Sequence, residues 1–146
     1  MKNPNTGKTF LDLDDINKVL PTDLVLNPKS IYRGVYNSSN GTLLSISNSR
    51  TYPKGAIAWY YVYADRYLEK GVKYMLFTVG LEGLILLPMD AFQDYKKGCY
   101  WKEGLKRGEK RYRIDIYKRD GKWLFLNSSV RYEKQLDVTP YFIPFS

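Results

Sequence analysis

Basic and aromatic side chains are concentrated in one stretch of the sequence, residues 96–122. This stretch holds 11 basic and 4 acidic residues, so it carries +7 of the net charge of +8. Lysine and arginine neutralise phosphates, and interleaved aromatic rings can stack on bases or position them. The pattern indicates a surface for a polyanion, and nucleic acid is the polyanion that we expect. The alternative interpretation is a solvated sheet face whose charges protect an edge strand from aggregation.

The candidate binding residues of this stretch lie on one predicted strand and in the loop before it. Residues 110–118 alternate, so that the apolar residues face one way, while Arg111 and Arg113 face the other. The polar face would meet the ligand, and the upstream loop would add cations and a ring. The predicted nucleic-acid-binding residues here are Trp101, Lys106, Arg107, Arg111 and Arg113.

A second candidate site is the loop of residues 49–55, which leads into Trp59. The loop places an arginine, a tyrosine and a lysine before a strand rich in aromatic residues. These groups could bind a phosphate and a base together. A Pro-Gly turn between two strands explains the same residues equally well. The binding residues predicted here are Arg50, Tyr52, Lys54 and Trp59.

The sequence contains no histidine and a single cysteine, Cys99. Ser-His-Asp and Cys-His catalysis, histidine-based zinc sites and an all-thiolate zinc site within one chain are therefore excluded. We predict no catalytic residue, no metal and no cofactor. A lone cysteine cannot form an internal disulfide, and this fits a reducing compartment.

A metal-dependent nuclease of the PD-(D/E)XK class stays open, because it needs only carboxylates, a lysine and a divalent cation. Asp94-Tyr95-Lys96 has the spacing of the short motif of this class but falls in a predicted helix. Asp115 precedes Lys118 by three positions, where the motif requires two. Further acids would have to come from Asp65 and Glu69. Structural salt bridges are the simpler interpretation of all these residues.

Five short stretches between residues 30 and 143 resemble a known kind of domain. They are Ser49-Arg50-x-Tyr52-Pro53-Lys54-Gly55, Trp59-Tyr60, Tyr74-Met75-Leu76, Leu86-Leu87-Pro88 and Leu136-Asp137-Val138-Thr139-Pro140-Tyr141. Together they resemble a domain found with bacterial restriction-type nucleases. The resemblance implies a DNA-related role in restriction or phage defence.

Strand patterns dominate the chain and are accompanied by two short helices. The patterns predict helices at 10–20 and 89–96, a helical turn at 64–70, and strands at 30–36, 42–48, 56–63, 72–79, 84–87, 110–118 and 123–126. Hairpin signals lie at residues 37–41 and at Asp120-Gly121. We expect an α+β fold with a mainly antiparallel, strongly twisted or barrel-like sheet, centred on 72–79 and 84–87. Residues 136–145 should pack back on the core as an extended segment.

The chain of 146 residues is expected to form one domain, 1–146, with residues 1–9 as a flexible leader. No signal-peptide pattern and no apolar run of membrane-spanning length is present. We therefore expect a cytoplasmic protein without a membrane partner. The predicted function is a non-catalytic nucleic-acid-binding domain, with DNA as the ligand. The alternatives are a PD-(D/E)XK-like nuclease and a basic module that covers an acidic protein partner.

Overall fold

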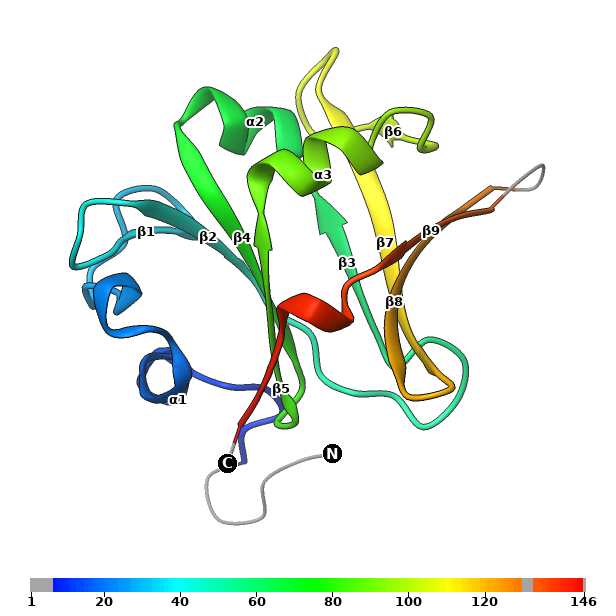
Figure 1. The fold of residues 1–146 in the computed structure, drawn as a ribbon. Helices are drawn as coiled ribbons and strands as arrows, with labels where there is room; N and C mark the ends of the chain where they lie inside the picture. The colour runs from blue at the N-terminus through cyan, green and yellow to red at the C-terminus, as the bar shows by residue number, and fades with distance from the viewer. Residues whose placement is uncertain (1–6, 130–132, 146) are drawn as a thin grey trace.

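The computed structural model describes residues 7–129 and 133–145 and contains two β-sheets that face each other (Figure 1). The first sheet has the order β1-β2-β4-β5-β10, and the second has the order β3-β7-β8-β9, with β6 paired to β7. The strands are β1 (Val35–Asn37), β2 (Leu43–Ser47), β3 (Ala58–Val62), β4 (Val72–Val79), β5 (Gly83–Pro88), β6 (Lys102–Glu103), β7 (Lys110–Arg119), β8 (Lys122–Ser128), β9 (Glu133–Asp137) and β10 (Phe142–Pro144). The helices are α1 (Leu13–Val19), α2 (Ala64–Glu69) and α3 (Met89–Tyr95), with short 3-10 turns η1 (Thr22–Leu24) and η2 (Thr139–Tyr141).

The α+β class and the mainly antiparallel pairing are confirmed. Among the pairs of named strands, only β2 and β4 are parallel. The strands divide into two open sheets instead of curving into one barrel-like sheet. The helical turn predicted at 64–70 is a third helix, α2. Residues 1–6 of the predicted leader lie outside the described residues, and Lys8 is fixed by an ion pair to Asp15, 2.6 Å long.

The main core lies between the two sheets. Phe77 of β4 makes edge-to-face contacts with Tyr60 of β3 and Phe125 of β8, at centroid distances of 5.0 and 5.1 Å. A second core lies on the other face of the first sheet, where α1 and the segment around it cover that sheet (Figure 1). Strands β4 and β5 are therefore buried on both faces, and this confirms the sheet centre that their apolar runs predict.

Local sequence signals account for the ends of several elements. Asp12 caps α1 by accepting a hydrogen bond from the Asp15 N–H, and the Asp15 carboxylate accepts one from the Asp12 N–H in return. Pro88 precedes α3, as predicted. Asp120 and Gly121 have φ angles of +52° and +77° in the β7–β8 hairpin, which suits the tight turn that the Asp-Gly pair predicts.

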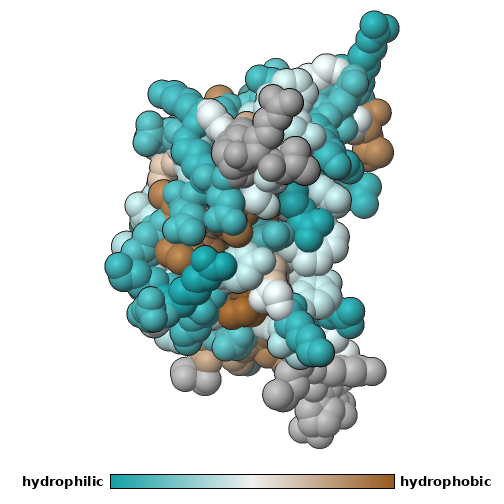
Figure 2. Space-filling model, turned by 90° about the vertical axis from the view of Figure 1, so that its right-hand side faces the viewer, coloured by the Kyte–Doolittle hydropathy of each residue, from teal (hydrophilic) through white to brown (hydrophobic). Residues whose placement is uncertain are grey.

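The face seen from the side of β8 and β9 is mainly hydrophilic, and its hydrophobic residues form small separate patches (Figure 2). Basic residues contribute to this polar character, because β7 and β8 carry Lys118, Arg119 and Lys122 at and near their common turn. Within the described part of the chain, no helix is both long and apolar enough to cross a membrane.

Gly83 sets how closely β10 can approach β5, because a Cβ here would overlap the Ile143 carbonyl oxygen and lie 2.7 Å from Phe142 Cζ. We predict that Gly83→Ala lowers the free energy of unfolding by about 1–3 kcal/mol through overpacking. Urea unfolding measures the effect. Pro144→Ala, at the position paired with Gly83, adds no bulk and should change stability by less than about 1 kcal/mol. Equal stability of wild type and Gly83→Ala would contradict the packing argument.

Candidate nucleic-acid interface

The outer face of the second sheet carries aromatic rings on β3 beside arginines on β7. Alternation along β3 turns Tyr60 and Val62 into the core and leaves Trp59 and Tyr61 outside, with Tyr61 42% exposed. The register pairs Tyr61 with Arg113. Cross-strand neighbours on one face are close enough for their side chains to interact. The rings of β3 and the guanidinium groups of β7 therefore meet on one surface.

These four side chains, Trp59, Tyr61, Arg111 and Arg113, form an arginine–aromatic ladder. Arg113 Cζ lies 4.1 Å from the Trp59 ring centroid and 5.8 Å from that of Tyr61. Arg111 Cζ lies 4.2 Å from the Tyr61 centroid on the same face. Each cation–π contact contributes about 0.5–2 kcal/mol, depending on its desolvation. The rings therefore hold two cations at fixed positions before any ligand arrives.

The two arginines of the ladder differ in their hydrogen bonds. Arg113 Nε donates to Asp115 Oδ1 at 2.8 Å. Burial alone would lower the pKa of Arg113, but its hydrogen bonds to Asp115 and Tyr61 leave that pKa above the ordinary value. Arg111 Nε is buried and has no hydrogen-bond partner among the described residues. A buried donor without a partner is costly, and the contact of Arg111 with the Tyr61 ring holds its side chain in place despite this cost.

The loop of residues 49–57 joins the ladder at Trp59. Arg50 Cζ lies 4.8 Å from the Tyr52 ring centroid. The pKa of Tyr52 is lowered by a hydrogen bond with Arg50, by one with Trp59, and by the charges of Arg50 and Arg113. A lowered phenol pKa indicates a positive potential at this position. The two candidate sites predicted from the sequence therefore form one continuous positive surface.

A polar junction fixes the start of this loop to the first sheet. Ser49 Oγ donates to the Arg50 carbonyl at 2.7 Å and accepts from the Trp59 N–H at 3.3 Å. The Ser49 N–H donates to Thr78 Oγ1 on β4 at 3.2 Å. Gly80 allows the loop to approach closely, because a Cβ there would lie 2.6 Å from Thr51 Cγ2. The hydrogen bonds of the Ser49 hydroxyl with the Arg50 carbonyl and the Trp59 N–H therefore fix the backbone of both residues.

Asn127 positions the upstream loop against β7. Its buried side chain accepts from the Tyr100 N–H at 2.7 Å, and donates to the carbonyls of Tyr100 at 3.0 Å and of Arg113 at 3.2 Å. Trp101, the next residue, is 43% exposed, and its ring centroid lies 5.0 Å from Lys110 Nζ. Asn127 therefore supports the backbone at both Arg113 and the residue before Trp101.

The structure brings five of the nine predicted binding residues together and places Trp101 at the upstream end of β7. The five are Arg50, Tyr52, Trp59, Arg111 and Arg113. The other three, Lys54, Lys106 and Arg107, lie in exposed loops. The sequence-based site omits Tyr61 and Asn127. The position of Tyr61, two residues after Trp59 on an alternating strand, was a usable signal, whereas Asn127 carries none that distinguishes it.

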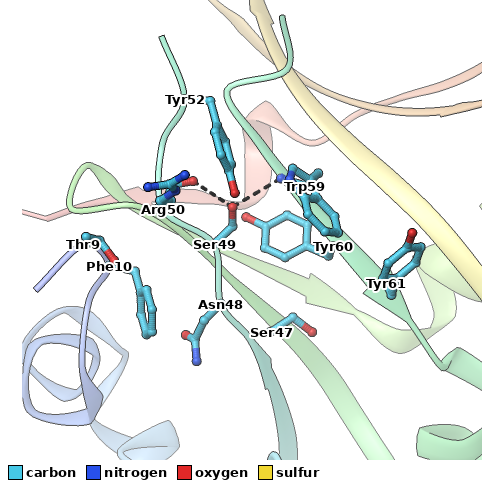
Figure 3. Close-up of a pocket in the computed structure, with 10 residues that line it drawn as sticks. All are labelled: Thr9, Phe10, Ser47, Asn48, Ser49, Arg50, Tyr52, Trp59, Tyr60 and Tyr61. Carbon is cyan, nitrogen blue, oxygen red and sulfur yellow. Dashed lines mark hydrogen bonds between the residues drawn. The ribbon is translucent and has the colours of Figure 1, made fainter. Parts of the chain in front are cut away.

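A pocket of about 390 Å³ opens beside the ladder, between the end of β2 and the edge strand β3. Its lining residues are Thr9, Phe10, Ser47, Asn48, Ser49, Arg50, Tyr52, Trp59, Tyr60 and Tyr61. In Figure 3, Phe10 and Trp59 lie on opposite sides, Tyr52 lies above, and Ser47 and Asn48 lie below. The pocket thus shares Arg50, Tyr52 and the rings of β3 with the positive surface.

The charge on the outer face changes sign across the second sheet. Glu133 and Asp137 on β9 are exposed and lie in the same cross-strand rows as the outward residues of β8. Hydrogen bonds from Thr139 lower the pKa of Asp137, so its carboxylate stays ionised. The outer face of the second sheet therefore carries acidic side chains at its β9 edge and arginines on β7.

The acids considered for a nuclease are held in ion pairs or lie apart. Lys96, of the Asp94-Tyr95-Lys96 motif after α3, forms an ion pair with Asp65 of α2, and Asp115 pairs with Arg113. Within residues 7–129 and 133–145, no three His, Cys, Asp or Glu side chains lie close enough to hold a metal ion. The salt-bridge interpretation therefore accounts for Asp65, Lys96 and Asp115.

The chain was compared with protein-family models, with curated proteins and with solved structures, and no match was found in any of the three. The geometry and charge of the second sheet are therefore the basis of the functional argument. Among the described residues, the ladder and the pocket beside it are where fixed cations, exposed rings and a cavity meet.

An ion pair between Arg66 and Glu109 anchors the basic loop to α2. Both bonds of the pair are short, at 2.7 and 2.9 Å, and Arg66 lies over the Tyr63 ring at 4.3 Å. The Gly104 N–H of the loop donates to the Glu109 carbonyl, and a Cβ at Gly104 would lie 2.7 Å from Tyr63 Cε1. The loop that carries Lys106 and Arg107 is therefore fixed at its base.

The hydrogen bond from Arg66 lowers the pKa of Glu109, so this pair should stabilise the fold in a pH-dependent way. Its contribution is complete above the pKa of an unfolded glutamate, about 4.3, and disappears as the pH falls through the lower folded value. We predict that Glu109→Gln lowers the Tm at neutral pH and that this difference closes in acid. Thermal unfolding at several pH values measures it, with Glu103→Gln as the control. A constant difference throughout the acid range would contradict the assignment.

Proposed function

We propose that this protein is a non-catalytic nucleic-acid-binding domain whose ligand, DNA, lies along β3 and β7. The observation that supports the proposal is the arginine–aromatic ladder, in which Arg111 is held on the exposed Tyr61 ring and Arg113 on the half-buried Trp59 ring. Guanidinium groups match phosphate oxygens with paired donors and carry their charge at any physiological pH. A role in restriction or phage defence is the context that we propose, and it rests on the sequence resemblance alone.

The ladder suits a phosphate backbone better than a stack of bases. Arg113 covers one face of the Trp59 ring and Arg111 covers one face of the Tyr61 ring, so a base cannot stack on those two faces. A phosphate oxygen can accept from the outward N–H groups of Arg113, whose side chain is 47% exposed. Because the arginines are already ordered, binding loses less side-chain entropy than it would with free lysines. The ladder thereby supplies an affinity for DNA that does not depend on the nucleotide sequence.

An acidic protein is a second candidate partner, favoured by the loop of residues 98–108. Leu105 is 88% exposed in this loop, between Lys102 and the pair Lys106 and Arg107. In a complex with an acidic protein, Leu105 would be buried against the partner, and the cations on both sides of it would face the partner's carboxylates. We also propose a cytoplasmic location, since Cys99 is a buried free thiol.

The first prediction from this proposal concerns Arg113→Gln. The variant should bind a duplex of about 20 base pairs roughly tenfold more weakly at about 50 mM salt, because one charge-assisted phosphate contact is lost. Its slope of log affinity against log salt should become shallower by about 1. Lys18→Gln makes the same charge change on α1, which covers the face of the first sheet that is turned away from the second sheet. This control variant should leave both the affinity and the salt slope unchanged. Equal effects of the two variants would reduce the proposal to general charge attraction.

The second prediction concerns catalysis. Because the proposed domain only binds, DNA incubated with it and with Mg²⁺ or Mn²⁺ should remain intact on a denaturing gel. Cleavage that needs the metal and is lost in Asp94→Ala or Asp115→Ala would overturn the non-catalytic assignment in favour of the nuclease alternative. Lys18→Gln serves again as the control for a general effect of substitution.

A further inference from the structure

We infer that the pocket beside the ladder receives one unpaired nucleobase, so that the preferred ligand is single-stranded DNA. This inference rests on the proposed function and specifies how the bound strand is arranged. The phosphates would lie on the ladder, and one base would turn from the strand into the pocket.

The pocket exists because β2 presents small side chains to the space between the sheets. Ser45 and Ser47 point to the side on which the neighbouring strand β4 places Met75 and Phe77. Two serines cannot fill the volume that Met75 and Phe77 fill beside them. Ser47, at the end of β2, lines the pocket, and its small polar side chain leaves a cavity there instead of a continued core.

Most of the aromatic residues that line this cavity belong to neither core. Phe10, Tyr52 and Trp59 belong to neither of the two clusters of packed hydrophobic residues. Aromatic rings normally contribute most to stability when they are fully buried in a core. Phe10, together with the faces of Tyr52 and Trp59 that Arg50 and Arg113 leave uncovered, supplies surfaces on which a planar apolar group can stack. A flat aromatic ligand fits this arrangement.

The polar lining fits the edge of a base. Thr9, Ser47 and Asn48 add hydroxyl and amide groups to the three rings. Asn48 Oδ1 accepts a hydrogen bond from Thr78 Oγ1 at 3.0 Å, which orients the amide. Small-molecule sites range from about 300 to 1,000 Å³ and combine apolar walls with a few polar groups. At about 390 Å³, this pocket suits a group of the size of one base or one nucleotide.

The pocket and the ladder are close enough to act on one strand. Arg50 lines the pocket, and Arg113 lies over Trp59, another lining residue. A base in the pocket would therefore have its own phosphates among fixed cations. A base in a duplex is paired and stacked, and turning it out costs a few kcal/mol. A single strand avoids most of this cost, so it should be the tighter ligand.

The experiment compares a thymidine oligonucleotide of about ten nucleotides with an abasic oligonucleotide of the same length. Both carry the same phosphates, so only the first can use the pocket. Stacking of a base on an aromatic side chain contributes enough to predict at least about fivefold tighter binding of the thymidine strand by the wild type. The thymidine strand should also bind more tightly than a duplex of equal length.

Two variants test the pocket itself. Ser47→Leu should fill it and Phe10→Ala should remove one wall, so both should abolish the preference for the thymidine strand but leave the affinity for the abasic strand unchanged. Phe10→Ala keeps the test decisive if Ser47→Leu fails to fold. Arg113→Gln should weaken binding to both strands alike. Tyr32→Ala removes a ring that is 44% exposed, lies under Lys70 and is outside the pocket, and it should change neither affinity.

Failure of the pocket inference and failure of the proposed function would give different binding results. Equal affinity of the wild type for the thymidine and abasic strands would overturn the pocket inference and leave the proposed function standing. A preference that persists in Ser47→Leu and Phe10→Ala would also overturn it, because the base would then bind elsewhere. No binding of any strand or duplex at about 50 mM salt would overturn the proposed function itself.

Discussion

The hydrogen bonds around Thr78 fix the two sheets relative to each other. Thr78 is buried in β4, where its hydroxyl donates to Asn48 and accepts from the Ser49 N–H, and its carbonyl accepts from the Tyr60 hydroxyl across the sheets. Leaving one of these groups unpaired would cost about 1–3 kcal/mol. The path from the first sheet into β3 is therefore tightly specified. Both the width of the pocket and the place of the rings of β3 follow from that path.

Most individual elements were predictable because their signals are local. Pro88 before α3 and Asp120-Gly121 between β7 and β8 determine the conformation of a few neighbouring residues. The division into two sheets was not predictable, since it depends on the pairing of Trp59 with Asp115, far along the chain. The parallel pairing of β2 with β4 was not predictable for the same reason, because the two strands are not adjacent in the sequence. Alternation shows which side of a strand is buried, but it does not identify the strand beside it.

The candidate site shows the same limit. Arg111 and Arg113 were identifiable from charge and alternation, and Trp59 from its aromatic strand, but only the register joins them in one ladder. Phe10 was expected to begin a helix and instead lines the pocket before α1 starts. Lys54, Lys106 and Arg107 show the reverse case. Their charges marked them as binding residues, yet charge alone does not tell a positioned cation from one in an exposed loop.

The order of the strands has a consequence for how the chain folds. In the sequence, β10 of the first sheet follows every strand of the second sheet. Likewise, β3 of the second sheet lies between β2 and β4 of the first sheet in the sequence, although β2 and β4 pair with each other. Neither sheet is a continuous piece of chain, so neither can be completed before strands from distant parts of the chain have come together. The edge of β5 stays open during synthesis until residues 142–144 have left the ribosome, and open edges favour aggregation. Folding should therefore be slow, cooperative and sensitive to truncation before β10.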